Sequence, residues 1–377
     1  MRIESVALHR VQIPLKRAFA HAASARTTSA AILVQVRDDA GHVGWGEIRP
    51  RPYVTGETMD GAFAEGAPSL AEQVLVQRWA DRDALVAWLA ALPDAVGLAT
   101  RGGFECALLD AGGRRFGFGF GQLLPGPWQP GLPPGVVVGF ETPTAKLGRH
   151  CAMLRLAKRR HVKVKVGADD DTERLTIVRD VFGEDVPLRI DANAAWTVPQ
   201  TLDKLASFVG LPIASIEQPI HRDDVAGLAR IRAEGGVPVM ADEAVCSEDD
   251  ARRLIAAQAA DIFNIRIGKH GGILPSLRIV QLATDAGVAV HLGTLVGETG
   301  ILSRVGEVFG AMVRGFDCLD GKGQAGFLLA EDVLSPDAEG KAPKLGEVEV
   351  TAPGLGVDVD EAQVARFRVG DATSISR

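Results

Sequence analysis

A regular alternation of short apolar runs with amphipathic segments, from residue 136 to residue 292, constrains the fold more than any other feature. The apolar runs are typical of buried strands, and the segments between them have the 3.6-residue periodicity of helices. The predicted strands are 162–166, 188–190, 213–216, 237–240, 262–267 and 288–292. Repeated strand–helix units predict a parallel sheet, either closed into a barrel or doubly wound.

The segments on either side of this repeat have a different character. Alternating apolar and polar residues in 31–36 and 43–47 predict an antiparallel hairpin around the turn Asp38-Asp39-Ala40-Gly41. An alanine-rich helical pattern follows from Thr58 to Arg115. Glycine and proline crowd residues 117–135, which is typical of a linker, and we interpret the glycine-rich run 116–121 as flexible. Residues 347–351 resemble a short strand that returns to this small N-terminal α+β domain.

Composition and charge exclude several classes of protein. The 377 residues carry a net charge of −7, which argues against a general nucleic-acid binder. No apolar run approaches the ~18 residues of a membrane span, and the N-terminus lacks the apolar core of a secretory signal. The four cysteines form no CxxC pair. We therefore expect a cytoplasmic protein with no membrane or nucleic-acid partner.

Carboxylates stand at the ends of three successive predicted strands. Asp191, Glu217 and Asp242 follow one another at intervals of 26 and 25 residues. In a parallel barrel the carboxyl ends of the strands meet at one rim, so these side chains should lie together. Such carboxylates repel one another unless a cation lies between them, and oxygen ligands suit Mg²⁺ or Mn²⁺. The alternative, three unrelated helix-capping acids, leaves the equal spacing unexplained.

Two lysines lie on the strand that precedes these carboxylates. Lys163 and Lys165 are two residues apart, so strand geometry places both on one face. Partial burial and a nearby cation both favour the neutral amine, which lowers a lysine pKa toward that of a general base. The alternative is a nucleic-acid patch over residues 155–165, but both lysines lie within a run of valines.

Taken in order, these motifs resemble the enolase superfamily, in its muconate-lactonizing-enzyme subgroup. The matching motifs are Trp45-Gly46-Glu47, Tyr53-Val54-Thr55-Gly56-Glu57-Thr58, Lys163-Val164-Lys165, Asp191-Ala192-Asn193, Glu217-Gln218-Pro219, Asp242-Glu243, Asn264-Ile265-Arg266, Lys269-His270-Gly271-Gly272 and Gly297-Glu298-Thr299-Gly300. The resemblance implies an α+β capping domain over residues 1–130 and a modified (β/α)7β TIM-type barrel over 131–335. Residues 336–377 would form a C-terminal segment that returns to the capping domain.

The resemblance also implies a chemistry. One Mg²⁺, held by the three carboxylates, would bind the carboxylate of a small-molecule substrate, and a base would remove the α-proton to give an enediolate. Lys165 would be that base, and Lys163 would tune its pKa. Asn193 and Glu243 would contact the substrate or support the site from behind.

The sequence departs from the family pattern where racemases and epimerases have a second catalytic lysine. That position, 24 residues after Asp242, is Arg266, and arginine is effectively never a general base. In one interpretation Arg266 is a fixed cation and Lys165 acts alone, as in a cycloisomerase or lyase. In the other, Lys269 supplies the missing acid–base group and the protein is a racemase or epimerase of N-acyl amino acids or dipeptides. Strand alternation favours the first interpretation.

Specificity is expected to depend on the loops around the barrel mouth. Dipeptide epimerases of the subgroup carry an Asp-x-Asp motif, and here Cys318 replaces its first aspartate while Asp320 keeps the second. The candidate residues of the substrate loops are His21, Arg26, Arg49, Arg51 and Tyr53. Glu298, just after the seventh strand, is predicted to face the site as a hydrogen-bond partner or secondary acid. The arginines suggest a second anionic group on the substrate, although a solvated charged loop is an equal alternative. A homo-oligomer and a non-catalytic binding protein remain further possibilities.

Overall fold

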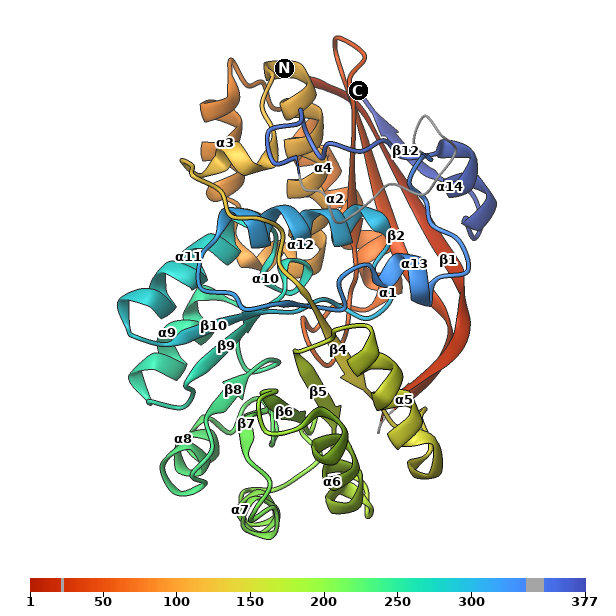
Figure 1. Cartoon of the computed structure of the whole chain (residues 1–377). Helices are drawn as coiled ribbons and strands as arrows, with labels where there is room; N and C mark the ends of the chain where they lie inside the picture. Colours follow the sequence, from red (N-terminus) through yellow and green to blue (C-terminus); the bar gives the residue numbers. More distant parts are fainter. Residues whose placement is uncertain (22–23, 337–348) are drawn as a thin grey trace.

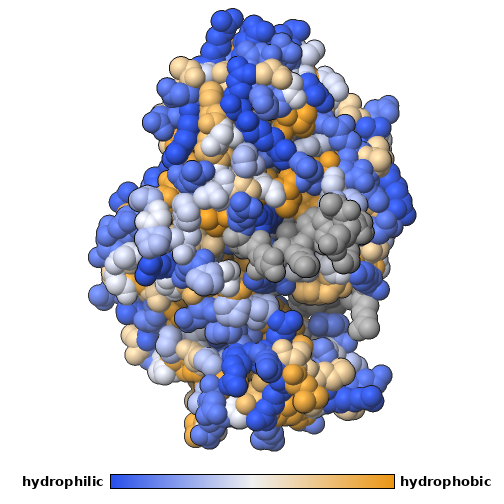
Figure 2. Space-filling view, turned by 45° about the horizontal axis from the view of Figure 1, so that its top comes forward, coloured by the Kyte–Doolittle hydropathy of each residue, from blue (hydrophilic) through white to orange (hydrophobic). Residues whose placement is uncertain are grey.

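The computed structural model describes residues 1–21, 24–336 and 349–377, with side chains described outside 17–26. Figure 1 shows an antiparallel sheet with its helices at one end and a barrel at the other. Hydrophilic side chains cover most of the face seen in Figure 2, with hydrophobic ones in small groups between them. Among the described residues, no helix is both long and apolar enough to span a membrane.

The N-terminal sheet contains the predicted hairpin. Its strand order is β12-β1-β2-β3, with all neighbours antiparallel. The strands are β1 (Ile3–His21), β2 (Ser24–Asp38), β3 (Val43–Ile48) and β12 (Thr373–Ser376). Asp38 closes the β2–β3 turn by accepting hydrogen bonds from the backbone N–H groups of Ala40 and His42. The C-terminal strand β12 thus joins the sheet formed by the first residues of the chain.

Helix α4 lies between this sheet and the barrel. The helices of this part are α1 (Met59–Gly61), α2 (Ala67–Leu75), α3 (Arg82–Ala90) and α4 (Leu98–Phe116), with a π-helical turn at Ala62–Gly66 and 3-10 turns at Asp94–Val96 and Phe120–Leu123. Glycines allow α4 to lie directly on β3: a Cβ on Gly44 or Gly46 would lie 2.2 or 1.9 Å from a backbone oxygen of α4. On its other side, Gly102 approaches the backbone of Gly272 in the barrel. Because α4 is covered on both sides, it is buried over nearly its whole length.

A buried glutamate joins α4 to the barrel. Glu105 Oε1 accepts a hydrogen bond from the backbone N–H of Leu274 at 3.0 Å, in the first turn of α11 (Ile273–Asp285). Its other oxygen, Oε2, is buried without a hydrogen-bond partner. Burial therefore raises the pKa of Glu105 to about 7.

We expect Glu105→Gln to stabilise the protein at alkaline pH. The raised pKa means that the folded state holds this proton more tightly than the unfolded chain does, so stability falls as the pH rises from about 4.5 to about 7. Glutamine removes this loss, and the gain at about pH 8 should be on the order of 2 kcal/mol. Urea unfolding of the variant and the wild type at about pH 5.5 and about pH 8 measures this difference in unfolding free energy. The exposed Glu72→Gln is the control, and an equal pH dependence in Glu105→Gln and wild type would contradict the prediction.

Eight parallel strands close the barrel among the described residues, which confirms the predicted (β/α)7β architecture. The strands are β4 (Pro134–Val138), β5 (Val162–Lys165), β6 (Leu188–Asp191), β7 (Ile213–Glu217), β8 (Val239–Ala241), β9 (Ile262–Ile265), β10 (Ala289–Leu292) and β11 (Leu319–Asp320). The remaining helices are α5 (Thr144–Leu156), α6 (Asp171–Phe182), α7 (Val198–Ser207), α8 (Val225–Glu234), α9 (Glu248–Ala256), α10 (Ile267–His270), α12 (Gly300–Met312), α13 (Gln324–Leu328) and α14 (Glu361–Phe367).

Two expectations about the connecting segments are wrong. The glycine-rich run 116–121 is packed rather than loose: the backbone N–H of Gly121 donates to Val350 O at 2.9 Å, and a Cβ on Gly119 would lie 2.5 Å from Ala352 O. The strand predicted over 347–351 is a turn in its described part, 349–351. The glycines are needed for this close packing, not for flexibility.

Candidate active site

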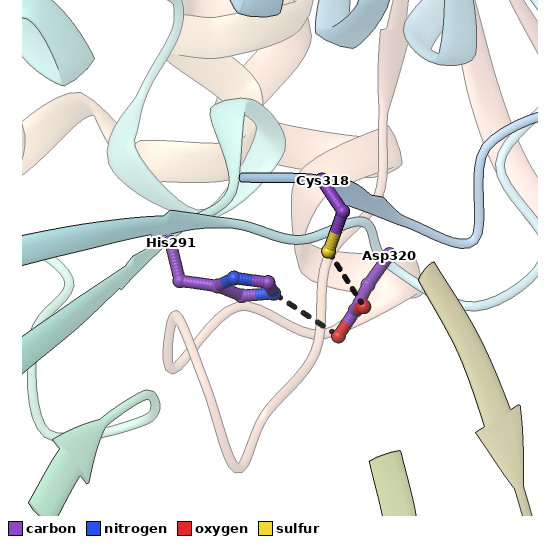
Figure 3. Close-up of side chains that lie close together, drawn as sticks. All are labelled: His291, Cys318 and Asp320. Atoms are coloured by element: carbon purple, nitrogen blue, oxygen red, sulfur yellow. Dashed lines mark hydrogen bonds and ion pairs between the residues drawn. The ribbon is translucent and has the colours of Figure 1, made fainter. Parts of the chain in front are cut away.

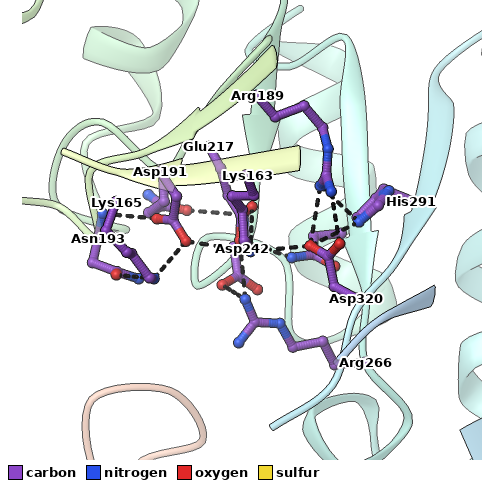
Figure 4. A network of polar contacts seen from close by, with 12 residues as sticks. Lys163, Lys165, Arg189, Asp191, Asn193, Glu217, Asp242, Arg266, His291 and Asp320 are labelled. Carbon is purple, nitrogen blue, oxygen red and sulfur yellow. Dashed lines mark hydrogen bonds and ion pairs between the residues drawn. The ribbon is translucent and has the colours of Figure 1, made fainter. Parts of the chain in front are cut away.

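The three predicted carboxylates meet at the carboxyl ends of adjacent barrel strands. Asp191 ends β6, Glu217 ends β7 and Asp242 directly follows β8. The strand register pairs Asp191 with Glu217, so the two side chains start at the same level. All three residues have no exposed surface, and Figure 4 shows their carboxylates close together.

Four cationic side chains surround these carboxylates. Lys165 Nζ lies 2.6 Å from Asp191 Oδ2, and Lys163 Nζ lies 2.9 Å from Glu217 Oε2. On the opposite side, Arg266 Nη2 lies 3.0 Å from Glu217 Oε1 and also pairs with Asp242 Oδ2. Lys269 Nζ lies 2.9 Å from Asp242 Oδ1. The cluster therefore alternates charge, as Figure 4 shows for the residues it labels.

The pKa of Lys163 lies above its ordinary value. Burial alone would lower it, but the carboxylates of Glu217, Asp320 and Asp191 outweigh burial. Lys163 therefore serves as a positive partner of the carboxylates in this structure.

The donor set fits a hard divalent cation. All three side chains offer carboxylate oxygen, which Mg²⁺ prefers, and they come from adjacent strands of a rigid barrel. Asp242 Oδ2 is buried and accepts no hydrogen bond. It forms an ion pair with Arg266. Glu243 Oε2, next to it in the sequence, is also buried without a partner.

A cavity of about 190 Å³ lies between the barrel rim and the N-terminal domain. From the barrel it is lined by Lys165, Asn193, Ala194, His221, Arg222, Glu243, Arg266, Leu295, Val296 and Gly297, and from the N-terminal domain by Leu15, Thr28, Ser29, Arg49, Arg51, Tyr53 and Val54. Seven residues predicted from the sequence thus line one cavity: Lys165, Asn193, Glu243, Arg266, Arg49, Arg51 and Tyr53. The side chains of His21 and Arg26 lie outside the described residues.

Lys165 and Arg266 face each other across the barrel. Lys165 ends β5 and Arg266 directly follows β9, and these strands are four places apart in either direction around the barrel. Lys165 also donates to Asn193 Oδ1. The sequence interpretation that gave Arg266 a place in the cavity therefore agrees with the geometry.

Lys269 does not line this cavity. It lies on the short helix α10, has no exposed surface, and donates to Asp242 O and Asn264 O at 2.7 and 2.9 Å. Its ammonium group is therefore held behind Asp242.

Glu298 also lies outside the cavity lining. It accepts a hydrogen bond from the backbone N–H of Leu295 at 2.6 Å and another from Gln324 at 3.4 Å. Burial raises the pKa of Glu298 to about 8. Its position indicates that it holds the loop after β10 rather than facing a substrate.

The sequence interpretation missed a cluster inside the barrel that supports Lys163. Asp320, on β11, lies 3.2 Å from Lys163 Nζ and is bound by Arg189 through two hydrogen bonds of 2.6 and 3.1 Å. His291 Nε2 lies 3.2 Å from the same carboxylate. The sequence could have indicated Arg189, because this residue lies two positions before Asp191 and therefore on the same face of the strand.

This cluster is not a second metal site. His291, Cys318 and Asp320 place their ligand atoms within 4.8 Å of one another, and Figure 3 shows both His291 and Cys318 directed at Asp320. However, Arg189 contacts the same atoms, with Nη1 2.8 Å from His291 Nε2 and Nη2 2.6 Å from Asp320 Oδ1. A guanidinium group already occupies the position that a cation would take.

Comparisons with known proteins agree with this architecture. A family model described as "Enolase C-terminal domain-like" matches residues 146–363, more than half of the chain. The D-Ala-D/L-Ala epimerase of Cytophaga hutchinsonii is 30% identical over 298 residues, which cover 78% of this chain and 79% of the epimerase. Muconate cycloisomerase 1 of Pseudomonas putida is 30% identical over 274 residues, which cover 71% of each chain.

A solved structure supports the same assignment. The dipeptide epimerase from Cytophaga hutchinsonii, complexed with Mg and the dipeptide D-Ala-L-Val, matches with a TM-score of 0.84 and 27% identity over 100% of both chains. The resemblance found in the sequence motifs is thus confirmed. The chain belongs to the enolase superfamily, in its mandelate racemase and muconate lactonizing enzyme branch, and is one of that superfamily's isomerases or lyases.

Proposed function

We propose that this enzyme removes the proton α to a substrate carboxylate with Lys165 as its only base, and completes a cycloisomerisation or elimination on one face of the substrate. One observation carries the proposal: across the barrel from Lys165 lies Arg266, which stays protonated at neutral pH and does not act as a general base. The nearby amine of Lys269 makes three hydrogen bonds away from the cavity.

The roles of the side chains follow from their positions. Asp191, Glu217 and Asp242 would hold Mg²⁺, whose charge, when bound, stabilises negative charge on the substrate carboxylate. Lys165, 12% exposed at the cavity wall, takes the proton. Arg266, fixed by two carboxylates, offers a permanent positive charge from the other side. Lys269 positions Asp242.

A second candidate is a two-base epimerase, which the likeness to the D-Ala-D/L-Ala epimerase favours. It requires a second acid–base group on the face opposite Lys165. Lys269 is the nearest titratable amine to Arg266 in the sequence, and it would have to leave Asp242 to serve.

Proton exchange in D₂O with Mg²⁺ distinguishes the two candidates. A pool of N-acyl amino acids, dipeptides, betaines, hydroxy acids and lactones is incubated with the enzyme and read by mass and chirality. Deuterium gained with retention, or an unsaturated or cyclised product, supports the one-base reaction. Deuterium gained with inversion supports the epimerase, and no exchange in any acid contradicts both.

We expect Arg266→Lys to introduce inversion into this reaction. The substitution keeps a positive charge but places a titratable amine across the cavity from Lys165. Loss of the guanidinium's paired contacts to Glu217 and Asp242 should slow total exchange about tenfold. Chiral analysis of deuterated substrate measures the change, and Arg266→Met, which has no amine, is the control. Inversion already present in the wild type would contradict the one-base proposal.

We further propose, from the sequence, that Mn²⁺ can replace Mg²⁺ at the carboxylates and that the domain boundaries lie at residues 130 and 335. A cytoplasmic location and a homo-oligomer are proposed on the same ground. Retention of all three carboxylates speaks against a binding protein that has lost its chemistry.

A further inference from the structure

Three side chains of the N-terminal domain hold a barrel loop, residues 293–299 between β10 and α12, which we call the β10 loop. Ser29 lies on β2, Glu47 lies on β3, and Arg49 directly follows β3. All three are buried. Residues 295–297 of the β10 loop line the cavity. One wall of the cavity is therefore a barrel loop that contacts the other domain.

The guanidinium group of Arg49 is bound within the protein, where the β10 loop lines the cavity. Nη1 donates to Glu47 Oε1 at 2.9 Å, and Nη2 donates to Val296 O and to Ser29 Oγ, both at 2.9 Å. Ser29 Oγ in turn donates to Gly297 O at 2.6 Å. Only 1% of the Arg49 surface is exposed, so its charge offers little surface to a substrate.

Glu47 binds the far end of the same loop. Its Oε2 accepts hydrogen bonds from the backbone N–H and the hydroxyl of Thr299, at 3.1 and 2.7 Å, and from the backbone N–H of Leu302 at 3.4 Å. These donors lie at the N-terminus of α12, where a carboxylate is favoured. Glu47 itself lies outside the cavity lining, so it acts on the cavity only through this loop.

The contact between the domains is too close for a side chain at residue 297. Gly297 has a φ of +83°, and a Cβ there would lie 2.5 Å from Ser29 Oγ and 3.2 Å from Arg49 Nη2. Glycine adopts this conformation without strain and leaves room for the two side chains. The position of the Arg49 fork therefore limits where the backbone of the loop can lie.

We infer that Arg49 is a positioning residue: its hydrogen bonds to the β10 loop set where Leu295 and Val296 lie in the cavity, and thereby how tightly substrate binds. The inference goes beyond the proposed function, which gives Arg49 no part, although its kinetic test uses the exchange reaction of that function. A wall that contacts the substrate equally in ground state and transition state changes KM and leaves kcat unchanged. The competing role is a direct contact between the Arg49 charge and the substrate.

Arg49→Lys tests the inference, because lysine keeps a positive charge beside Glu47 but cannot reproduce the two-nitrogen fork. For each acid whose α-proton exchanges in D₂O, we expect KM to rise about tenfold and kcat to stay within about twofold of the wild type. Amide hydrogen exchange, read by mass spectrometry on the full chain in Mg²⁺, should become faster in residues 293–299. The charge-neutral double variant Glu47→Gln/Arg49→Met should show both effects.

Arg101→Lys is the matched control. Arg101 is an equally buried arginine of the N-terminal domain, pairs with Asp94 at 2.7 Å, and lies outside the cavity lining. Because it does not contact the β10 loop, its variant should keep the wild-type KM and the wild-type amide exchange of residues 293–299. Any general loss of stability should appear in both lysine variants.

The remaining outcomes separate the inference from its rivals. An unchanged KM in Arg49→Lys, or a raised KM without faster amide exchange in residues 293–299, would overturn the inference. A KM that rises in the double variant but not in Arg49→Lys would assign Arg49 a direct contact with substrate. If no acid exchanges in the wild type, the proposed function fails, and the amide exchange of residues 293–299 by itself confirms or overturns the positioning by Arg49.

Discussion

Lys165→Ala should reduce α-proton exchange by about 10²- to 10⁴-fold, the usual contribution of a positioned general base. The alanine variant lacks the only lysine amine that lines the described cavity, and Arg266 across the barrel cannot replace it. Deuterium incorporation in D₂O, measured by mass spectrometry on any substrate the wild type accepts, gives the rate.

Two measurements show that such a loss comes from the missing base. Mg²⁺ affinity should not fall, because the variant loses a cation 2.6 Å from Asp191 and keeps every carboxylate. Lys146→Ala, which removes an exposed lysine on α5, should behave like the wild type. Exchange at the wild-type rate in Lys165→Ala would rule out this lysine as the base.

Glu217→Gln should abolish both metal binding and catalysis. Changes in groups that merely support a metal ligand lower affinity about 10- to 100-fold, so removing a ligand charge should lower Mg²⁺ affinity more than about 100-fold. Glu217 also accepts hydrogen bonds from Lys163, Asn264 and Arg266. Two buried cations would lose one shared partner while Lys163 keeps Asp320 and Arg266 keeps Asp242, so the loss should cost about 1–3 kcal/mol of unfolding free energy.

Calorimetry with Mg²⁺ and urea unfolding in chelator measure these two effects separately. Glu234→Gln is the matched control, because its carboxylate is exposed and pairs with Arg230 on the surface. Such surface pairs contribute about 0–1 kcal/mol. Wild-type Mg²⁺ affinity in Glu217→Gln would mean that the cation binds elsewhere.

The barrel could be predicted because its strands are short, largely buried and regularly spaced. Six strands were predicted within two residues of their bounds at both ends, since apolar runs and helix caps mark them directly. β11 has only two residues, Leu319 and Asp320, and gives no comparable signal. The packing of the glycine-rich run 116–121 was also not predictable, because glycine spacing is the same for a loose connector and for a close backbone contact.

The active-site residues also fall into those that the sequence predicts and those that it does not. Residues at strand ends, such as Asp191 and Glu217, are predictable because strand register brings them to one rim. The direction of the Lys269 side chain could not be predicted from strand alternation, because β9 ends at Ile265 and helix α10 begins at Ile267. The place of Arg222 in the cavity lining could not be predicted, because this loop arginine is positioned by contact with Val54, which is 168 residues away in the sequence.

The way α4 is seated determines how a ligand reaches the cavity. Gly103 brings α4 close to the backbone of β3, and Gly102 brings it close to that of Gly272, so that a Cβ at either position would crowd its neighbour. Separating the two domains would break the contact between Gly102 and Gly272 together with the Glu105 hydrogen bond to α11, which opposes large-scale opening. Ligand exchange must then proceed through side chains at the rim, where Tyr53 and Val296 are 51% and 41% exposed. Turnover in this enzyme should accordingly respond to substitutions of these two residues far more than to those that loosen the domain boundary.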